Sequence, residues 1–299
     1  MPLESALHRA TSVLEAAGIA GARAEAELLA GHLLGLRRGE LRVRAVLGDA
    51  APEGLDALVA RRATRVPLQH LTGTAPFRHL ELAVGPGVFV PRPETEQVAE
   101  VAVRHAREVV ARRGAALVAD LCAGTGALAL AMADEVPGVQ VHAVELDRDA
   151  LAWCRRNVAK LDPAGAVRVV GGDARTALAE LDGDVDVVVS NPPYIPPDAV
   201  PVDPEVRDHD PAVALYGLGP DGLEVPRGIV DAAARLLRPG GVLVMEHAEV
   251  QAEQVRVLVR RTGCFDEVRT EQDLAGRDRM VVARRVDRPA PPPVKDSRT

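Results

Sequence analysis

The sequence is short of cysteine and has no long apolar run. Its three cysteines, Cys122, Cys154 and Cys264, are odd in number and have neither metal-ligand nor disulfide-framework spacing. We therefore expect no metal site and a reducing compartment. No apolar segment has the length of a membrane span, and the first residues lack the charged-then-apolar layout of a signal peptide. The sequence thus predicts a cytoplasmic protein without membrane contact.

Positive charge is also in deficit over the whole chain. The formal net charge of -7 argues against a protein that wraps nucleic acid phosphates. The first 65 residues nevertheless carry a group of arginines. These are Arg37, Arg38, Arg42, Arg44, Arg61, Arg62 and Arg65. The simpler interpretation is solvated surface charge balanced by nearby acids, and the alternative is a docking surface for an acidic or nucleic-acid-like partner.

Three segments with different periodicities divide the chain. Apolar residues at steps of three and four predict a helical N-terminal domain over residues 1–65. We expect it to be a substrate-docking domain. Alternation from Leu80 to Val84, then Gly85-Pro86-Gly87 and a second alternating pair, Val88 and Val90, predict a β-hairpin linker within residues 66–93.

Residues 94–286 alternate between helical and strand patterns. This order predicts an α/β domain with a mainly parallel, Rossmann-like sheet of seven strands and right-handed crossovers. Residues 196–221 interrupt it with a long proline-rich segment, which indicates a functional loop. The proline-rich residues 287–299 are predicted to be a disordered tail.

Polar or glycine-rich residues follow the first three strands of this domain, where ligands bind in an open α/β sheet. The first strand leads into a glycine turn, Cys122-Ala123-Gly124-Thr125-Gly126, whose backbone can approach a ligand closely. Glu145 ends the second strand, where a carboxylate can accept both ribose hydroxyls. Asp173 follows the third strand, near the expected adenine edge. Together these residues indicate an adenosine-containing cofactor.

The fourth strand ends in the turn Asn191-Pro192-Pro193-Tyr194. The Asn191 side-chain oxygen and the Pro192 carbonyl could accept the two hydrogens of a planar –NH2 group, while the Tyr194 ring stacks on it. With the cofactor pattern upstream, this predicts methyl transfer from S-adenosylmethionine to nitrogen. No Ser–His or Cys–His pair near the turn suggests a covalent route, and we expect His247 to be structural.

Four segments resemble the HemK-type peptide chain release factor glutamine methyltransferases. They are residues 67–96 (with Pro91-Arg92-Pro93-Glu94-Thr95-Glu96), 120–133, 190–195 and 271–279. The resemblance implies methylation of the N5 nitrogen of the glutamine in the Gly-Gly-Gln loop of bacterial release factors. It also implies that residues 122–126, Glu145, Asp173 and Ala174 surround the cofactor, and that residues 191–194 hold the glutamine amide. We expect Arg92 and Asn191 to line the cofactor pocket as well.

Other functions remain open at this stage. The same turn serves methyltransferases acting on amino groups of DNA or RNA, and a related class methylates a ribosomal-protein glutamine. A non-catalytic cofactor-binding interaction protein is the third alternative. We expect a monomer that makes no sequence-specific contact with nucleic acid.

Overall fold

The computed structural model describes residues 1–162 and 164–287, and the chain divides into two compact units. Unit 1 consists of Met1–Thr74, Val84–Pro86 and Pro201–Asp210. Unit 2 consists of Ala75–Ala83, Gly87–Val200 and the described chain from Pro211 onward. The predicted domain boundaries stay a prediction, and the predicted tail lies outside the described residues except for Asp287.

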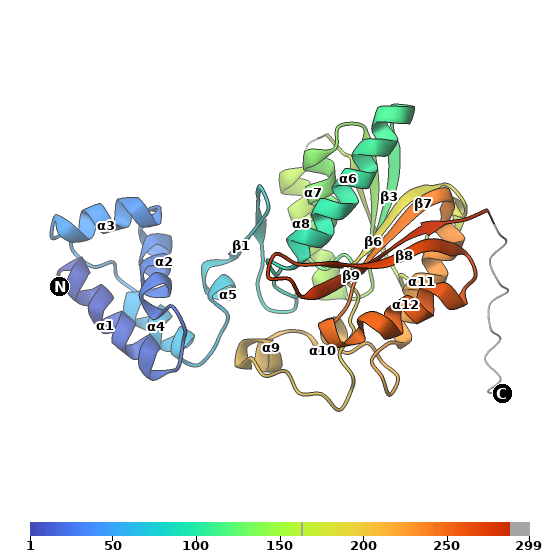
Figure 1. The fold of residues 1–299 in the computed structure, drawn as a ribbon. Coiled ribbons are helices and arrows are strands. Elements are labelled where there is room, and N and C mark those ends of the chain that lie inside the picture. The colour runs from blue at the N-terminus through green and yellow to red at the C-terminus, as the bar shows by residue number, and fades with distance from the viewer. Residues whose placement is uncertain (163, 288–299) are drawn as a thin grey trace. The chain divides into compact units, whose positions relative to one another are not determined.

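Unit 1 is helical (Figure 1), and every helix of it except the last contributes residues to an apolar core. Leu3, Leu7 and Leu14 on the first helix pack with Leu29 and Leu41. The helices are α1 (Leu3–Ala16), α2 (Ala22–Leu34), α3 (Arg38–Val46), α4 (Leu55–Ala63), α5 (Leu68–Thr72) and α9 (Pro204–His209). The last of these comes from the segment 196–221, for which the sequence showed no periodicity.

The arginines of unit 1 are largely paired with acids inside the unit. Glu27, which is 2% exposed, accepts hydrogen bonds from Arg23, Arg38 and Arg42 at 2.5 to 3.2 Å. Arg62 bonds Glu25 and lies 2.7 Å from Glu205. The expectation of solvated charge is wrong for Arg62, because its side chain is buried with these partners.

The predicted hairpin forms with the expected strand near Leu80–Val84, but the partner strand is not the predicted Val88–Val90 segment. Its strands are β1 (Thr74–Phe77) and β2 (Leu80–Ala83), and its turn is Arg78-His79. Val88 and Val90 are buried without joining a strand. Arg78 has a φ of 51°, and its side chain binds Glu135 and Glu100, which holds the turn there. Pro76 inside β1 obscured the strand pattern in the sequence.

Unit 2 contains a seven-stranded sheet with the order β5-β4-β3-β6-β7-β9-β8. The five strands from β5 to β7 are parallel, and β9 runs antiparallel to both its neighbours. The strands are β3 (Ala116–Leu121), β4 (Val139–Glu145), β5 (Val167–Gly171), β6 (Val185–Ser190), β7 (Leu237–Glu246), β8 (Phe265–Gln272) and β9 (Asp278–Arg285). The predicted Rossmann-like fold is confirmed.

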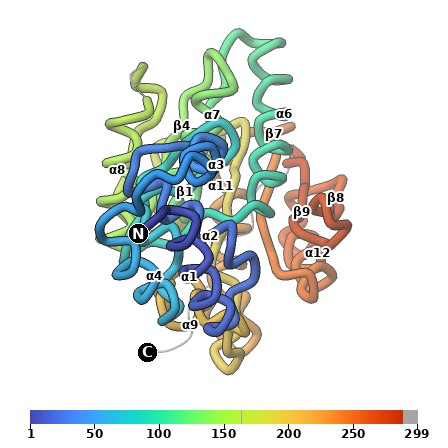
Figure 2. Tube along the Cα trace, turned by 90° about the vertical axis from the view of Figure 1, so that its left-hand side faces the viewer, coloured from blue at the N-terminus to red at the C-terminus, as the bar shows by residue number. Residues whose placement is uncertain are grey.

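Helices cover both faces of this sheet (Figure 1). Val187 and Val189 pack in one apolar cluster and Val188 in the other, as the two-residue period of a strand requires. One face carries α6 (Thr95–Arg113), α7 (Ala127–Glu135) and α8 (Arg148–Leu161); the other carries α11 (Glu224–Leu236) and α12 (Ala252–Arg261). Figure 2 shows α12 beside β8 and β9. Short helices complete the unit: α10 (Ala212–Leu215), η1 (Ala179–Leu181) and η2 (Glu249–Gln251).

We predict that Glu27→Gln destabilises unit 1 at neutral pH. Burial alone would raise the pKa of Glu27, but hydrogen bonds from Arg38, Arg23 and Arg42 outweigh it and lower the pKa to about 2. The carboxylate therefore contributes stability above its unfolded pKa, and that stability is lost as the pH falls from about 4.5 toward 2. At pH 7 the free energy of opening, from hydrogen exchange in α1 and α2, should fall by about 2 to 3 kcal/mol.

The control is Glu15→Gln, since Glu15 is exposed. The difference between wild type and Glu27→Gln should shrink below pH 4.5. A difference that stays constant down to pH 3 would contradict this role of the carboxylate.

Candidate active site

The register of the parallel strands aligns their carboxyl ends at one edge of the sheet. Leu121 at the end of β3 lies opposite Val144 of β4 and Ser190 of β6. Glu145 lies opposite Gly171, and Ser190 lies opposite Met245. The residues that end or follow these strands therefore share this edge. They are Cys122, Glu145, Asp173, Asn191 and Glu246.

The glycine turn is held by two side chains from neighbouring elements. Glu145 is 8% exposed, and its carboxylate accepts from the backbone N–H of Gly124 at 2.7 Å and of Asp147 at 2.8 Å. Burial raises the pKa of Glu145, and these backbone donors oppose the shift. On the other side, the buried Asn157 of α8 donates to the carbonyl of Thr125 at 3.0 Å. The turn is thus fixed before any ligand arrives.

Burial raises the pKa of three titratable groups at the foot of the turn. Asp120 is fully buried and accepts from the Ala129 N–H at 3.0 Å, and within residues 1–162 and 164–287 its Oδ1 has no hydrogen-bond partner. Burial raises the pKa of Asp120 to about 7. Burial also raises the pKa of Cys122 and of Cys154, so both thiols stay neutral. Neither cysteine is poised as a nucleophile.

Two of the remaining predicted cofactor residues, Asp173 and Arg92, contact other side chains of the protein. The Asp173 carboxylate forms a bidentate pair with Arg175, at 2.7 and 3.0 Å, and Ala174 is buried beside it. The Arg92 guanidinium stacks over the Phe89 ring at 4.7 Å. The roles of Asp173, Ala174 and Arg92 toward the cofactor stay predictions.

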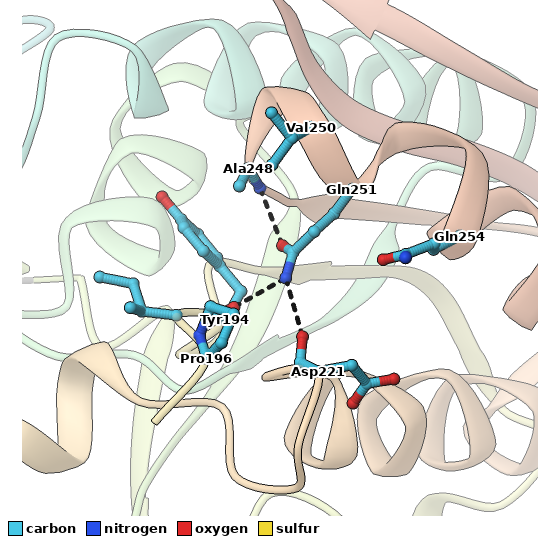
Figure 3. Close-up of a pocket in the computed structure, with 8 residues that line it drawn as sticks. Tyr194, Pro196, Asp221, Ala248, Val250, Gln251 and Gln254 are labelled. Atoms are coloured by element: carbon cyan, nitrogen blue, oxygen red, sulfur yellow. Dashed lines mark hydrogen bonds between the residues drawn. The ribbon is translucent and has the colours of Figure 1, made fainter. Parts of the chain in front are cut away.

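The backbone of the Asn-Pro-Pro-Tyr turn is fixed by residues far along the chain. The side-chain amide of Gln251 donates to the carbonyls of Tyr194, at 2.8 Å, and Asp221, at 3.3 Å (Figure 3). Gly222 has a φ of 69°, and a Cβ there would lie 2.5 Å from the Tyr194 carbonyl oxygen. A Cβ on Gly217 would overlap the Gly222 carbonyl and lie 2.7 Å from that of Pro193. The segment after the turn therefore packs directly on its backbone.

A hydrogen-bonded chain links the turn to β7. Asn191 Nδ2 donates to Thr95 Oγ1 at 3.2 Å, and Thr95 Oγ1 donates to Glu246 Oε2 at 2.8 Å. The Tyr194 hydroxyl lies 3.5 Å from Glu246 Oε1, and burial raises the pKa of this phenol. Among the described residues, no hydrogen bond reaches Asn191 Oδ1 or the Pro192 carbonyl oxygen. Neither oxygen is therefore occupied by a hydrogen bond from the described chain.

Thr95 and Glu246 are site residues for which the sequence predicted no role. A signal existed, because Glu246 ends a strand of the sheet as Glu145 does. The expectation for its neighbour fits the geometry: His247 is 1% exposed, and its Nδ1 lies 2.8 Å from the Ala248 carbonyl. Burial lowers the pKa of His247, which keeps the imidazole neutral.

The chain is similar in sequence to known proteins over most of its length. Residues 5–73 match the family model of the PrmC N-terminal domain, and residues 79–203 match that of the methyltransferase small domain. A Mycolicibacterium smegmatis protein named release factor glutamine methyltransferase is 50% identical over 291 residues, which cover 96% of this chain and 99% of that protein. The chain belongs to the release factor glutamine methyltransferase family.

Another relative is named for a small-molecule substrate. The 4-amino-L-phenylalanine/4-methylamino-L-phenylalanine methyltransferase of Streptomyces pristinaespiralis is 43% identical over 265 residues, covering 87% of this chain and 88% of that one. A solved methyltransferase from Pyrococcus furiosus is 19% identical with a TM-score of 0.51, covering 76% of this chain and 98% of that chain. The last match supports the fold alone.

Membership of the release factor glutamine methyltransferase family makes S-adenosylmethionine the cofactor, and the edge of the sheet fits it. A Cβ on Gly124 would have no neighbour within 4 Å, so the glycine turn borders open space. Glu145, whose carboxylate lies at this turn, stays the predicted acceptor for the ribose hydroxyls. In the described part of the chain, no helix is both long and apolar enough to cross a membrane.

We predict that Glu145→Ala weakens cofactor binding. The change removes the carboxylate that fixes the Gly124 N–H and an acceptor for the ribose. Calorimetric titration with S-adenosylmethionine should give a Kd raised about 10-fold or more. The exposed Glu180→Ala is the control; an unchanged Kd in Glu145→Ala would remove Glu145 from the site.

We predict that Gly222→Ala impairs methyl transfer more than cofactor binding. The new Cβ would push on the Tyr194 carbonyl and displace the turn. The matched control is Gly263→Ala, because Gly263 has a similar φ of 68° but no atom within 4 Å of an added Cβ. Turnover should fall at least about 10-fold in Gly222→Ala alone. Equal turnover of the two variants would contradict the packing argument.

Proposed function

We propose that this protein transfers a methyl group from S-adenosylmethionine to the N5 nitrogen of the glutamine in the Gly-Gly-Gln motif of peptide chain release factors. The observation that carries the proposal is the orientation of the Asn191 amide. Its Nδ2 is bonded to Thr95, which leaves Oδ1 as an acceptor next to the Pro192 carbonyl. Two acceptors on one turn match the two N–H donors of a primary carboxamide.

The position of this turn supports transfer rather than binding alone. Asn191 follows β6 and the glycine turn follows β3, and these strands are neighbours in register. When bound, S-adenosylmethionine supplies an electrophilic methyl group on its sulfonium. Asn191 and Pro192 would hold the acceptor nitrogen in place beside it, and proximity of this kind can supply much of the rate enhancement.

The same acceptors favour the charge that develops on nitrogen. An amide nitrogen is a poor nucleophile because its lone pair is delocalised, and it becomes positive as the N–C bond forms. Hydrogen bonds accepted by Asn191 and Pro192 strengthen as that charge grows, so they stabilise the transition state more than the ground state. The half-buried ring of Tyr194 would pack on the plane of the amide.

An aromatic amine is the second candidate acceptor, because a planar arylamine offers the same two donors. The relative from Streptomyces pristinaespiralis is named for such a substrate. Higher identity and coverage favour the release factor: 50% over 96% of the chain for the Mycolicibacterium smegmatis protein, against 43% over 87%. We also propose that the enzyme is a monomer and that it acts in the cytoplasm; the scattered cysteines support the second part.

The acceptor is tested by incubating the protein with methyl-labelled S-adenosylmethionine and one acceptor at a time. The acceptors are a bacterial release factor, the same factor with its motif changed to Gly-Gly-Asn, ribosomal protein, RNA, DNA and 4-amino-L-phenylalanine. Label should enter the unchanged release factor, and peptide mass spectrometry should place it on the glutamine. Label that enters only the amino acid or nucleic acid would overturn the proposal.

We predict that Asn191→Ala lowers methyl transfer to the release factor at least about 100-fold, because one of two acceptors for the –NH2 group is lost. The Kd for S-adenosylmethionine, measured by calorimetry, should change little. Gln254→Ala is the control, since it removes an exposed carboxamide from the pocket beside Tyr194 (Figure 3). Near-normal turnover of Asn191→Ala would refute the role of this amide.

A further inference from the structure

We propose that Glu246 and Thr95 are positioning residues, which set the Asn191 amide so that its oxygen, and not its –NH2 group, faces the acceptor nitrogen. The proposal rests on the proposed function, because the acceptor is taken to be a primary amide. It adds two residues that do not touch substrate but decide what Asn191 presents to it.

An asparagine amide can adopt two orientations. Rotation by 180° exchanges Oδ1 with Nδ2 and leaves the shape of the side chain almost unchanged. In one orientation Asn191 accepts a hydrogen bond from the acceptor –NH2 group. In the other, two –NH2 groups face each other and repel. Efficient transfer therefore needs hydrogen-bond partners that stabilise one orientation over the other.

Glu246 and Thr95 are such partners, because an ionised carboxylate only accepts hydrogen bonds. The Thr95 hydroxyl must give its single hydrogen to Glu246 Oε2, 2.8 Å away. Its oxygen can then only accept, so the atom of Asn191 that lies 3.2 Å from it is the donor Nδ2. Oδ1 is thereby turned to the opposite side of the amide.

The surroundings of Glu246 hold it in place and set its charge. Glu246 is 3% exposed. It faces Glu94 and Thr95 at the start of α6, Tyr194 after β6 and Arg279 on β9. Arg279 is also paired with Asp273, and Glu94 with Arg277, both from the segment 271–279. Three segments of the family resemblance, 91–96, 190–195 and 271–279, therefore meet around this carboxylate.

Protonation of Glu246 would remove the preference for one orientation of the Asn191 amide. Burial raises its pKa to about 7, although Thr95 and Arg279 oppose the shift. A protonated Glu246 can donate to Thr95, and the Thr95 hydrogen is then free to bond Asn191 Oδ1. Both amide orientations become satisfied, and the fraction in the productive one falls. Methyl transfer should therefore decrease as the pH falls through about 7.

The test is single-turnover methyl transfer to a release factor at saturating S-adenosylmethionine, measured between pH 5.5 and 8.5. In wild type, the plot of rate against pH should have an acidic limb, in which the single-turnover rate decreases as the pH falls below about 7. Glu246→Gln keeps a polar side chain but cannot change charge, so it should be slower than wild type and lack this limb. The exposed Glu249→Gln is the matched control and should keep the wild-type profile.

A second pair of variants tests the relay, which is the hydrogen-bonded series Glu246–Thr95–Asn191, without changing Glu246. Thr95→Val removes the hydroxyl at nearly constant shape and should slow the single-turnover rate about 10-fold or more. Thr95→Ser restores the hydroxyl and should restore most of the rate. The Kd for S-adenosylmethionine should be the same in both, which separates positioning from a general structural defect.

The outcomes are distinct from those of the proposed function. If wild type labels the release factor, but Thr95→Val is as fast as Thr95→Ser, the relay is wrong and the proposed function stands. A limb below pH 7 that persists in Glu246→Gln would likewise overturn the relay and point to another group. If wild type does not label the release factor, the proposed function itself fails.

Discussion

A buried carboxylate needs polar partners, and the partners of Glu246 organise the catalytic edge of this protein. Its position at the end of β7 draws in the hydroxyl of Thr95 at 2.8 Å. Through Thr95 it reaches Asn191, and Tyr194 lies at its other oxygen. Because four elements meet at one carboxylate, the geometry of the turn is set by the fold rather than by the turn alone.

The backbone of the turn is constrained as tightly as its side chains. Gly217 and Gly222 let the following segment pack against the carbonyls of Pro193 and Tyr194, where a Cβ would not fit. Gln251 bonds the Tyr194 carbonyl at 2.8 Å. In the proposed function, a planar –NH2 group would be bound by oxygens whose places are fixed in advance, and such preorganisation would lower the barrier for a weak nucleophile.

Much of this could be predicted from the sequence, because strand endings are local. The glycine turn, Glu145 and Asn191 each follow a buried strand, and parallel register brings them to one edge. The Thr95–Glu246 contact joins residues 151 positions apart, so no local pattern reveals it. The hairpin was misplaced because Leu80–Val84 can pair with either flanking segment. Arg78, bound to acids on two helices, decides between them.

The most direct test of the account is a crystal structure with S-adenosylhomocysteine and a release factor fragment that contains the Gly-Gly-Gln motif. The account predicts that the glutamine side-chain nitrogen lies within about 3.2 Å of both Asn191 Oδ1 and the Pro192 carbonyl oxygen. Asn191 Nδ2 should still be bonded to Thr95. A glutamine whose carbonyl oxygen accepts from Asn191 Nδ2 would contradict the account.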